Sequence, residues 1–93
     1  MYKIEVRPSA AKEIRRLDKS TQKKVVGALE GLSAEPRPNG VKKLAGRNDL
    51  YRIKVGKDYR IVYQIEDDQL IVLVLAAGNR KDIYRSLTSR QGG

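Results

Sequence analysis

The sequence predicts an α+β domain, in which an N-terminal strand and then a helical hairpin pack on a small, mainly antiparallel sheet followed by a short C-terminal helix. Apolar residues alternate near the N-terminus and again after residue 50, which is the period of strands. Between these segments they recur at helical spacing over residues 10–32. A chain of 93 residues forms one small core, so we expect a single domain over residues 1–88 and a frayed tail over residues 89–93.

The first element is a strand over residues 2–7, in which Tyr2, Ile4 and Val6 share one face. Pro8 ends this strand, because proline has no backbone N–H for the ladder. Ser9 then follows as the expected N-cap of a helix, since its hydroxyl can accept a bond from a free backbone N–H.

Two helices follow, each with an apolar stripe. The first stripe comprises Ala10, Ala11, Ile14 and Leu17, and the second comprises Val25, Val26, Leu29 and Leu32. A cap among residues 18–20 begins the second helix. Because only a few residues connect them, the helices are expected to be antiparallel neighbours. Two prolines and an Asn-Gly pair within residues 34–40 then predict a loop.

The second half predicts a meander of three strands. Residues 50–55 and 59–65 alternate, while residues 70–77 are apolar throughout, which is typical of a strand at the sheet centre or covered on both faces. A three-residue loop over residues 56–58 opposes apolar positions throughout: Val55 with Tyr59, Ile53 with Ile61, and Tyr51 with Tyr63. Gly56 supplies the flexible position of this loop. Residues 80–87 form one or two helical turns.

Composition excludes several kinds of chemistry. The chain has neither Cys nor His, so thiol catalysis, serine–histidine catalysis, the two-histidine ribonuclease mechanism and Cys-ligated zinc are absent. There are 20 Lys and Arg against 11 Asp and Glu, and a net charge of +9 favours nucleic acid or an acidic protein as partner. The start lacks the apolar core of a signal peptide, and no apolar stretch approaches the length of a membrane span. A cytoplasmic location and no membrane partner are therefore expected.

The predicted register gathers positive charge. Lys54 lies opposite Arg60, with Arg52 one step along on the same face. Like charges across a strand pair are destabilising, so their presence favours an anion-binding face. Residues 42–60 hold seven basic residues and two acidic ones. The alternative interpretation is a solvated polar face that keeps the sheet soluble.

Other motifs have simpler explanations. Tyr51, Tyr59 and Tyr63 lie on the apolar face and are expected to pack in the core. The acidic residues 66–68 indicate a hairpin turn more than a metal site, and Gly78 is expected to let the last strand turn. Tyr84 lies in a charged setting, where it either stacks on a base or packs.

The most specific motifs are Lys43-Leu44-Ala45-Gly46, Tyr51-Arg52-Ile53-Lys54, Tyr59-Arg60-Ile61-Val62-Tyr63, Gly78-Asn79-Arg80 and Tyr84. On these the chain resembles the RelE/ParE superfamily of toxins from type II toxin–antitoxin systems, and RelE in particular. The resemblance implies an endoribonuclease, or mRNA interferase, that cuts mRNA in the ribosomal A site without metal or other cofactor. A ribose 2′-hydroxyl attacks the adjacent phosphate and leaves a 2′,3′-cyclic phosphate.

The resemblance also implies roles for residues. The implied catalytic residues are Arg52, Lys54, Arg60, Arg80 and Tyr84, and the implied RNA-binding residues are Lys42, Lys43, Arg47, Lys57 and Lys81. RelE commonly has Lys where this chain has Arg52. Lys54 is the candidate base, because positive neighbours favour the neutral form of an amine. Arg52 and Arg60 would stabilise the transition state, Arg80 the leaving oxygen, and Tyr84 would orient the nucleotide.

The implied partners are a RelB-like antitoxin, mRNA on the ribosome and ribosomal RNA, with promoter DNA bound only through the antitoxin complex. The antitoxin would carry a segment that folds on binding. Two alternatives remain: a non-enzymatic, ParE-like inhibitor of DNA gyrase, and an inactive or purely regulatory relative. ParE proteins generally lack the full basic set and the C-terminal Tyr, so Lys54 with Arg80 and Tyr84 favours RelE.

Overall fold

The computed structural model describes residues 1–44 and 50–83. Its helices are α1 (Pro8–Arg15) and α2 (Lys19–Ala34), and a single 3₁₀ turn, η1, spans Asp67–Gln69. Its strands are β1 (Lys3–Val6), β2 (Lys42–Lys43), β3 (Leu50–Val55), β4 (Tyr59–Glu66) and β5 (Ile71–Asn79). Arg47, Tyr84 and the tail over residues 89–93 lie outside the described residues, as does the second half of the expected C-terminal helix, residues 84–87.

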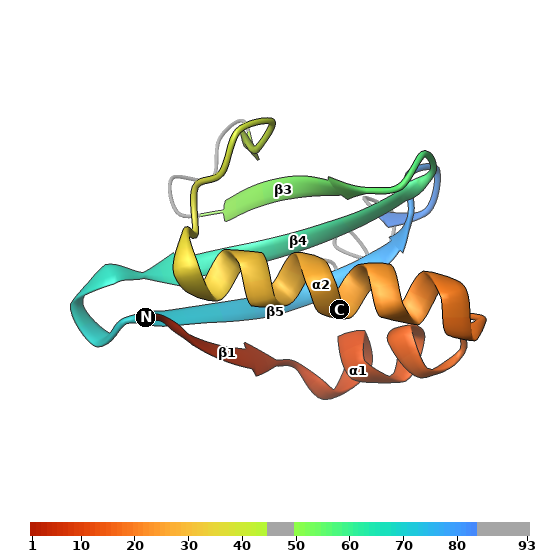
Figure 1. The fold of residues 1–93 in the computed structure, drawn as a ribbon, viewed down its shortest axis with the longest axis horizontal. Helices are drawn as coiled ribbons and strands as arrows, with labels where there is room; N and C mark the ends of the chain where they lie inside the picture. Colours follow the sequence, from red (N-terminus) through yellow and green to blue (C-terminus); the bar gives the residue numbers. More distant parts are fainter. Residues whose placement is uncertain (45–49, 84–93) are drawn as a thin grey trace, which may run out of the picture.

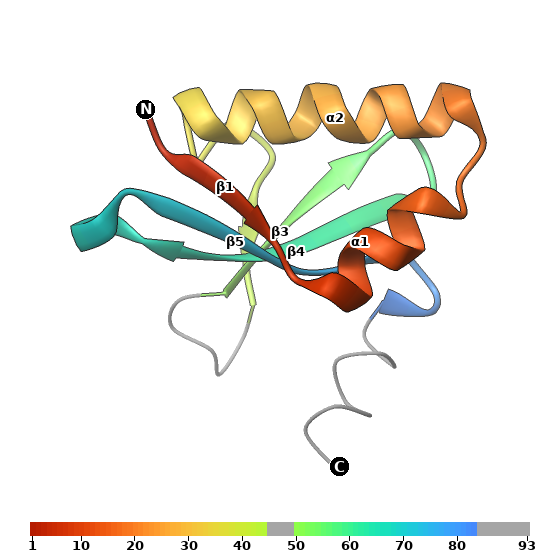
Figure 2. The same cartoon turned by 90° about the horizontal axis from the view of Figure 1, so that it is seen from below.

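The strands form one sheet in the order β1-β5-β4-β3-β2. β1 runs parallel to β5, and the other pairs are antiparallel. Both helices lie on one side of this sheet (Figures 1 and 2). This arrangement confirms the predicted α+β class, with a helical hairpin on a mainly antiparallel sheet. β5 is paired along both edges, as its unbroken apolar sequence indicated.

The predicted register between β3 and β4 is confirmed. Val55 lies opposite Tyr59, Ile53 opposite Ile61 and Tyr51 opposite Tyr63. The connecting loop is Gly56–Asp58, and Gly56 has a φ of 64°. That left-handed conformation is open to glycine at little steric cost, which is why the loop needs it.

The short strand β2 was not predicted. Its two residues pair with β3, Lys42 opposite Arg52 and Lys43 opposite Tyr51. Two residues show no measurable period, so the sequence pattern holds no signal for this strand.

The main core lies between the helices and the sheet. Its largest fully buried side chains include Tyr63, Leu32, Ile61, Val25, Val72 and Val74. Tyr51 and Tyr59 pack against this core as predicted, and the rings of Tyr51 and Tyr63 stack with centroids 5.9 Å apart. The expected inward position of Val26 is wrong, since Val26 is 50% exposed. Val26 lies about 100° round the helix from the fully buried Val25, on the solvent side of the apolar stripe.

The two helices begin differently. Pro8 is the first residue of α1, Arg7 is its N-cap, and no side chain caps this end. The predicted capping by Ser9 is therefore wrong, because the fixed φ of proline suits the first helical position and shifts the start by two residues. At α2 the prediction is confirmed: Asp18 accepts bonds from the Thr21 backbone N–H (3.2 Å) and from its hydroxyl (2.7 Å). These bonds, the hydroxyl first, lower the pKa of Asp18.

The expected turn at Gly78 is also wrong. Gly78 lies within β5, directly opposite Arg60, and the strand continues to Asn79. No helix in the part of the chain that the structure describes is long and apolar enough to span a membrane.

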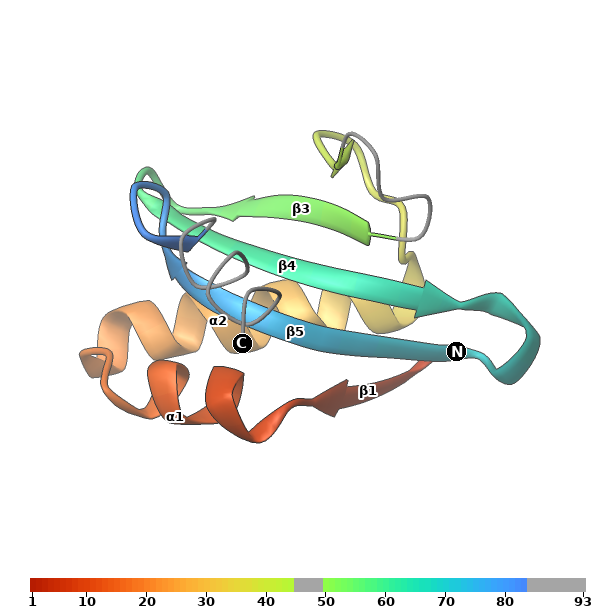
Figure 3. The same ribbon diagram turned by 180° about the vertical axis from the view of Figure 1, so that it is seen from behind.

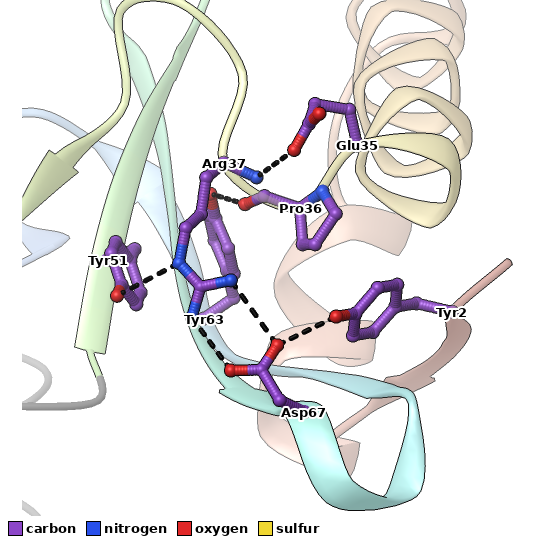
Figure 4. A network of polar contacts seen from close by, with 7 residues as sticks. All are labelled: Tyr2, Glu35, Pro36, Arg37, Tyr51, Tyr63 and Asp67. Atoms are coloured by element: carbon purple, nitrogen blue, oxygen red, sulfur yellow. Dashed lines mark hydrogen bonds and ion pairs between the residues drawn. The ribbon is translucent and has the colours of Figure 1, made fainter.

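A polar network closes the end of the sheet near the N-terminus (Figure 4). The guanidinium of Arg37 donates to both carboxylate oxygens of Asp67, at 3.3 and 2.9 Å, and its Nε donates to the Tyr51 hydroxyl at 3.2 Å. The Tyr2 hydroxyl donates to Asp67 at 2.7 Å. The buried Tyr63 hydroxyl donates to the Pro36 carbonyl at 2.8 Å. Together these bonds tie the loop before β2 to the sheet.

Candidate nucleic-acid interface

Four basic side chains share the face of the sheet opposite the helices. Ile53 and Val55 pack toward the helices, so the alternate residues Arg52 and Lys54 point to the other side. Directly opposed residues share a face, which places Lys42 beside Arg52 and Arg60 beside Lys54. We call Lys42, Arg52, Lys54 and Arg60 the basic face. It belongs to the side of the sheet that Figure 3 presents, with α2 behind the strands.

The charges of this face are largely unneutralised. Lys42 and Lys54 are exposed and Arg52 is half-buried. Among residues 1–44 and 50–83, no carboxylate forms an ion pair with any of the three. Free cations on one face attract an anion, because no carboxylate of the described residues already neutralises them.

Arg60 differs from the other three. It is 5% exposed, and its NH1 donates to the carbonyls of Lys57 (3.2 Å) and Tyr59 (2.8 Å). It therefore holds the β3–β4 loop, while its charge still adds to the potential of the face. The expectation that Arg60 also stabilises a reacting phosphate stays a prediction.

Arg80 directly follows β5 and lies at the same end of the sheet. Its backbone N–H donates to the carbonyl of Asp58 at 2.7 Å, and its Nε lies 3.9 Å from the Asp58 carboxylate. The Arg80 side chain remains 58% exposed. The loop over residues 56–58 thus joins Arg80 to the strands that hold Lys54 and Arg60.

The remaining predicted RNA-binding residues do not form one group. Lys43 is opposite Tyr51 and so points to the other side of the sheet from the basic face. Lys57 lies in the β3–β4 loop, where it lines a cavity beside the helices. Lys81 is exposed in a turn after β5, where its backbone N–H bonds the Asn79 side chain at 2.8 Å.

A small apolar cluster covers part of the face beside the basic residues. It consists of Val62, Ala76 and Ile83, with Leu44 packed against it. The strand period places Val62 here, since it lies opposite Arg52. The burial of Ile83 in this cluster could not be predicted, because the short charged segment around it shows no apolar period. This face is therefore not the uniformly solvated surface of the alternative interpretation.

The acidic residues 66–68 are explained as predicted. They enter the turn η1, where the carboxylate of Asp67 belongs to the network with Arg37 and Tyr2. Within the described ranges, no group of three or more acidic side chains is placed to hold a metal ion.

A family model for the ParE toxin of type II toxin–antitoxin systems, parDE, matches residues 4–84. The chain belongs to the RelE/ParE superfamily of such toxins. This confirms the family that the sequence motifs indicated.

Individual relatives carry RelE names. This toxin is 36% identical over 92 residues to an Escherichia coli protein named RelE-like toxin, with 96% of each chain covered. It is 30% identical to the mRNA interferase toxin RelE of Escherichia coli K12, again over 96% of each chain. In the solved intact RelBE toxin–antitoxin complex of E. coli, a chain matches with a TM-score of 0.76 and 31% identity, covering 85% of this toxin and 96% of that chain.

Proposed function

We propose that this chain is a RelE-type toxin, an endoribonuclease that cleaves mRNA in the ribosomal A site in the cytoplasm. The observation that carries the proposal is the register that sets Lys54 against Arg60 on the face of the sheet opposite the helices, with Arg80 held at the same end. A relative named mRNA interferase, 30% identical along nearly the whole chain, supports the same interpretation.

The proposed reaction uses the substrate's own ribose. Lys54 accepts the proton of the 2′-hydroxyl, and the freed oxygen attacks the adjacent phosphorus. The bond from phosphorus to the 5′-oxygen breaks, which yields a 2′,3′-cyclic phosphate. Water supplies the proton that turns the leaving 5′-oxygen into a hydroxyl, and Lys54 releases the proton it accepted to solvent. No metal or other cofactor enters these steps.

In the proposed reaction the arginines stabilise negative charge. Arg52 and Arg60 stabilise the extra negative charge of the phosphorane-like transition state. Arg80 stabilises the leaving 5′-oxygen electrostatically, since a guanidinium is a poor proton donor. Tyr84, outside the described residues, is assigned to stacking on the nucleotide or orienting it.

The ribosome supplies what this small site lacks. With no histidine, the toxin depends on a substrate already positioned for in-line attack. We assign Lys42, Lys43, Arg47, Lys57 and Lys81 to contacts with RNA phosphates, which are independent of sequence and sensitive to salt.

The proposed inhibitor is a RelB-like antitoxin. The E. coli relative of 31% identity was solved in an intact complex with its antitoxin, RelB. The uncompensated charge of Lys42, Arg52 and Lys54 suits a partner segment that brings carboxylates and covers the basic face. Promoter DNA would be bound through the antitoxin.

The test is primer extension on ribosomes programmed with a defined A-site codon. Purified toxin should produce a break within that codon, and the same RNA without ribosomes is the reference. Lys54→Ala should reduce cleavage by about 100-fold or more, the usual contribution of a general base. Lys12→Ala removes the same charge from an exposed position of α1 and should cleave like the wild type.

Two results would overturn the proposal. Full activity in Lys54→Ala would show that Lys54, the proposed base on the basic face, takes no part in the reaction. No break on either RNA would redirect attention to gyrase inhibition, the activity of ParE toxins, whose family model matches this chain, or to an inactive relative.

A further inference from the structure

A cavity of about 410 Å³ lies beside the β3–β4 loop, on the side of the loop toward the helices. Leu17 and Val55 contribute apolar wall, while Lys24 of α2, Lys57 of the loop and Asn79 at the end of β5 contribute polar groups. The reaction proposed above makes no use of this cavity.

Lys24 lies directly over the loop. A side chain added at Gly56 would meet the Lys24 Cδ at 3.9 Å and its Nζ at 4.0 Å. Gly56 thus presents bare backbone to the ammonium group, and its left-handed φ of 64° curls the loop at that point. The Lys24 ammonium is therefore placed over the loop that also carries Lys57.

Two basic residues and one acidic residue line the cavity, so its lining carries a net positive charge. In the part of the chain that the structure describes, neither Lys24 nor Lys57 forms an ion pair. The one acidic residue in the lining, Asp58, has its carboxylate 3.9 Å from the Nε of Arg80. Two lysines without an ionic partner among the described residues thus line one hollow, and their charge favours an anion there.

A neighbouring cavity provides the contrast. It measures about 220 Å³ and shares Leu17, Tyr59 and Asn79 with the first. Its charged residues are Glu13, Arg16 and Asp82, so acidic groups outnumber basic ones there. Only the larger of these two hollows favours an anion.

We propose that the larger cavity binds a phosphate of the RNA backbone, at a second position besides the phosphate that reacts. The loop over residues 56–58 connects the two positions: Arg60 of the basic face bonds the Lys57 carbonyl, and Lys57 lines the cavity. An RNA strand lying on the basic face would pass around the end of this loop to enter the cavity. That the ligand is a phosphate is inferred from the cavity alone. That this phosphate belongs to RNA rests on the proposed function.

The first experiment titrates the ¹⁵N-labelled toxin with inorganic phosphate and follows its backbone amides by NMR. The amides of Lys24, Gly56 and Lys57 should shift together in a saturable manner. Lys24→Gln should abolish these shifts, while Lys23→Gln should retain them, because Lys23 lines the outer side of α2. Absent shifts, or equal shifts in the Lys24→Gln variant, would overturn the proposal.

The second experiment measures binding to programmed ribosomes whose A-site codon carries 2′-O-methyl riboses, which block cleavage by removing the nucleophile. Lys24→Gln should reduce the slope of log affinity against log salt by about 1, as loss of one phosphate contact does. Lys23→Gln should leave the slope unchanged. Equal slopes in the two variants would refute the RNA assignment.

The two proposals fail separately. If Lys54→Ala retained full cleavage while phosphate still shifted the cavity amides, the proposed reaction would fall and the anion site would stand. If cleavage depended on Lys54 but no amide of the cavity responded, the reverse would hold.

Discussion

Ser9 in α1 and Ser33 in α2 differ in the hydrogen bonding of their hydroxyl groups. The hydroxyl of Ser9 is buried and has no hydrogen-bond partner among the described residues. The hydroxyl of Ser33, by contrast, donates to the Tyr2 carbonyl at 2.6 Å. A buried polar group without a partner loses its bonds to water and gains nothing in return.

The same substitution should therefore have opposite effects at the two positions. Ser9→Ala should raise the free energy of unfolding by about 1 kcal/mol, because it removes an unsatisfied hydroxyl and favours the helix. Ser33→Ala should lower it by about 1 kcal/mol, because the lost hydrogen bond to the Tyr2 carbonyl outweighs the gain in helix propensity within α2. Urea unfolding of both variants beside the wild type checks this. An equal loss in both would show that the Ser9 hydroxyl is satisfied in solution.

At the scale of elements, the connection between β4 and β5 carries backbone strain. Leu70 has a φ of 54°, in the left-handed region that disfavours residues with a Cβ. Its backbone is held on both sides, since its N–H donates to the Asp67 carbonyl and its carbonyl accepts from the Lys3 N–H. Its side chain is 50% exposed, so little burial compensates for the strain.

Leu70→Gly should be more stable than Leu70→Ala by about 1 kcal/mol, the reverse of the usual order for these residues. Both variants lose the same side-chain contacts, so their difference isolates the backbone term. In a domain of this size that difference corresponds to about 4–8 °C in the melting temperature. Thermal unfolding followed by circular dichroism measures it. A more stable alanine variant would mean that the turn adopts another conformation.

At the scale of the whole molecule, the network around Asp67 joins segments that are distant in the chain. Tyr2 precedes β1, Arg37 lies in the loop after α2, Tyr51 belongs to β3, and Asp67 lies between β4 and β5. The bonds from Arg37, and then that from Tyr2, lower the pKa of Asp67 from its ordinary value. The folded state therefore favours the ionised carboxylate.

This linkage has a definite sign. A carboxyl group whose pKa is lower in the folded state stabilises the fold fully above its unfolded pKa of about 3.8, and that stabilisation is lost as pH falls through the folded value. In Asp67→Asn the free energy of unfolding should fall less steeply than in the wild type as pH decreases from about 5 to about 2. Asp68→Asn serves as the control, because no described residue bonds its carboxylate. Urea unfolding across this range tests the effect, and an unchanged slope in Asp67→Asn would contradict it.

The sequence alone determined the local features that depend on side-chain period. Alternation placed Ile53 against Ile61 and, by the same register, Lys54 against Arg60, so the basic face follows from the order of residues in two strands and one loop. The capping of α2 by Asp18 was equally local. The motifs around Arg52, Arg60 and Arg80 were sufficient to indicate the family.

Only the tertiary structure decided which distant segments meet. A period of two tells which face a residue occupies, but it names no neighbouring strand, so the parallel pairing of β1 with β5 had no local signal. The burial of Arg60 and the reach of Arg80 to Asp58 depend on the path of the loop between β3 and β4. The cavity beneath Lys24 exists because α2 passes over that loop, and only packing between elements remote in the chain sets such a crossing.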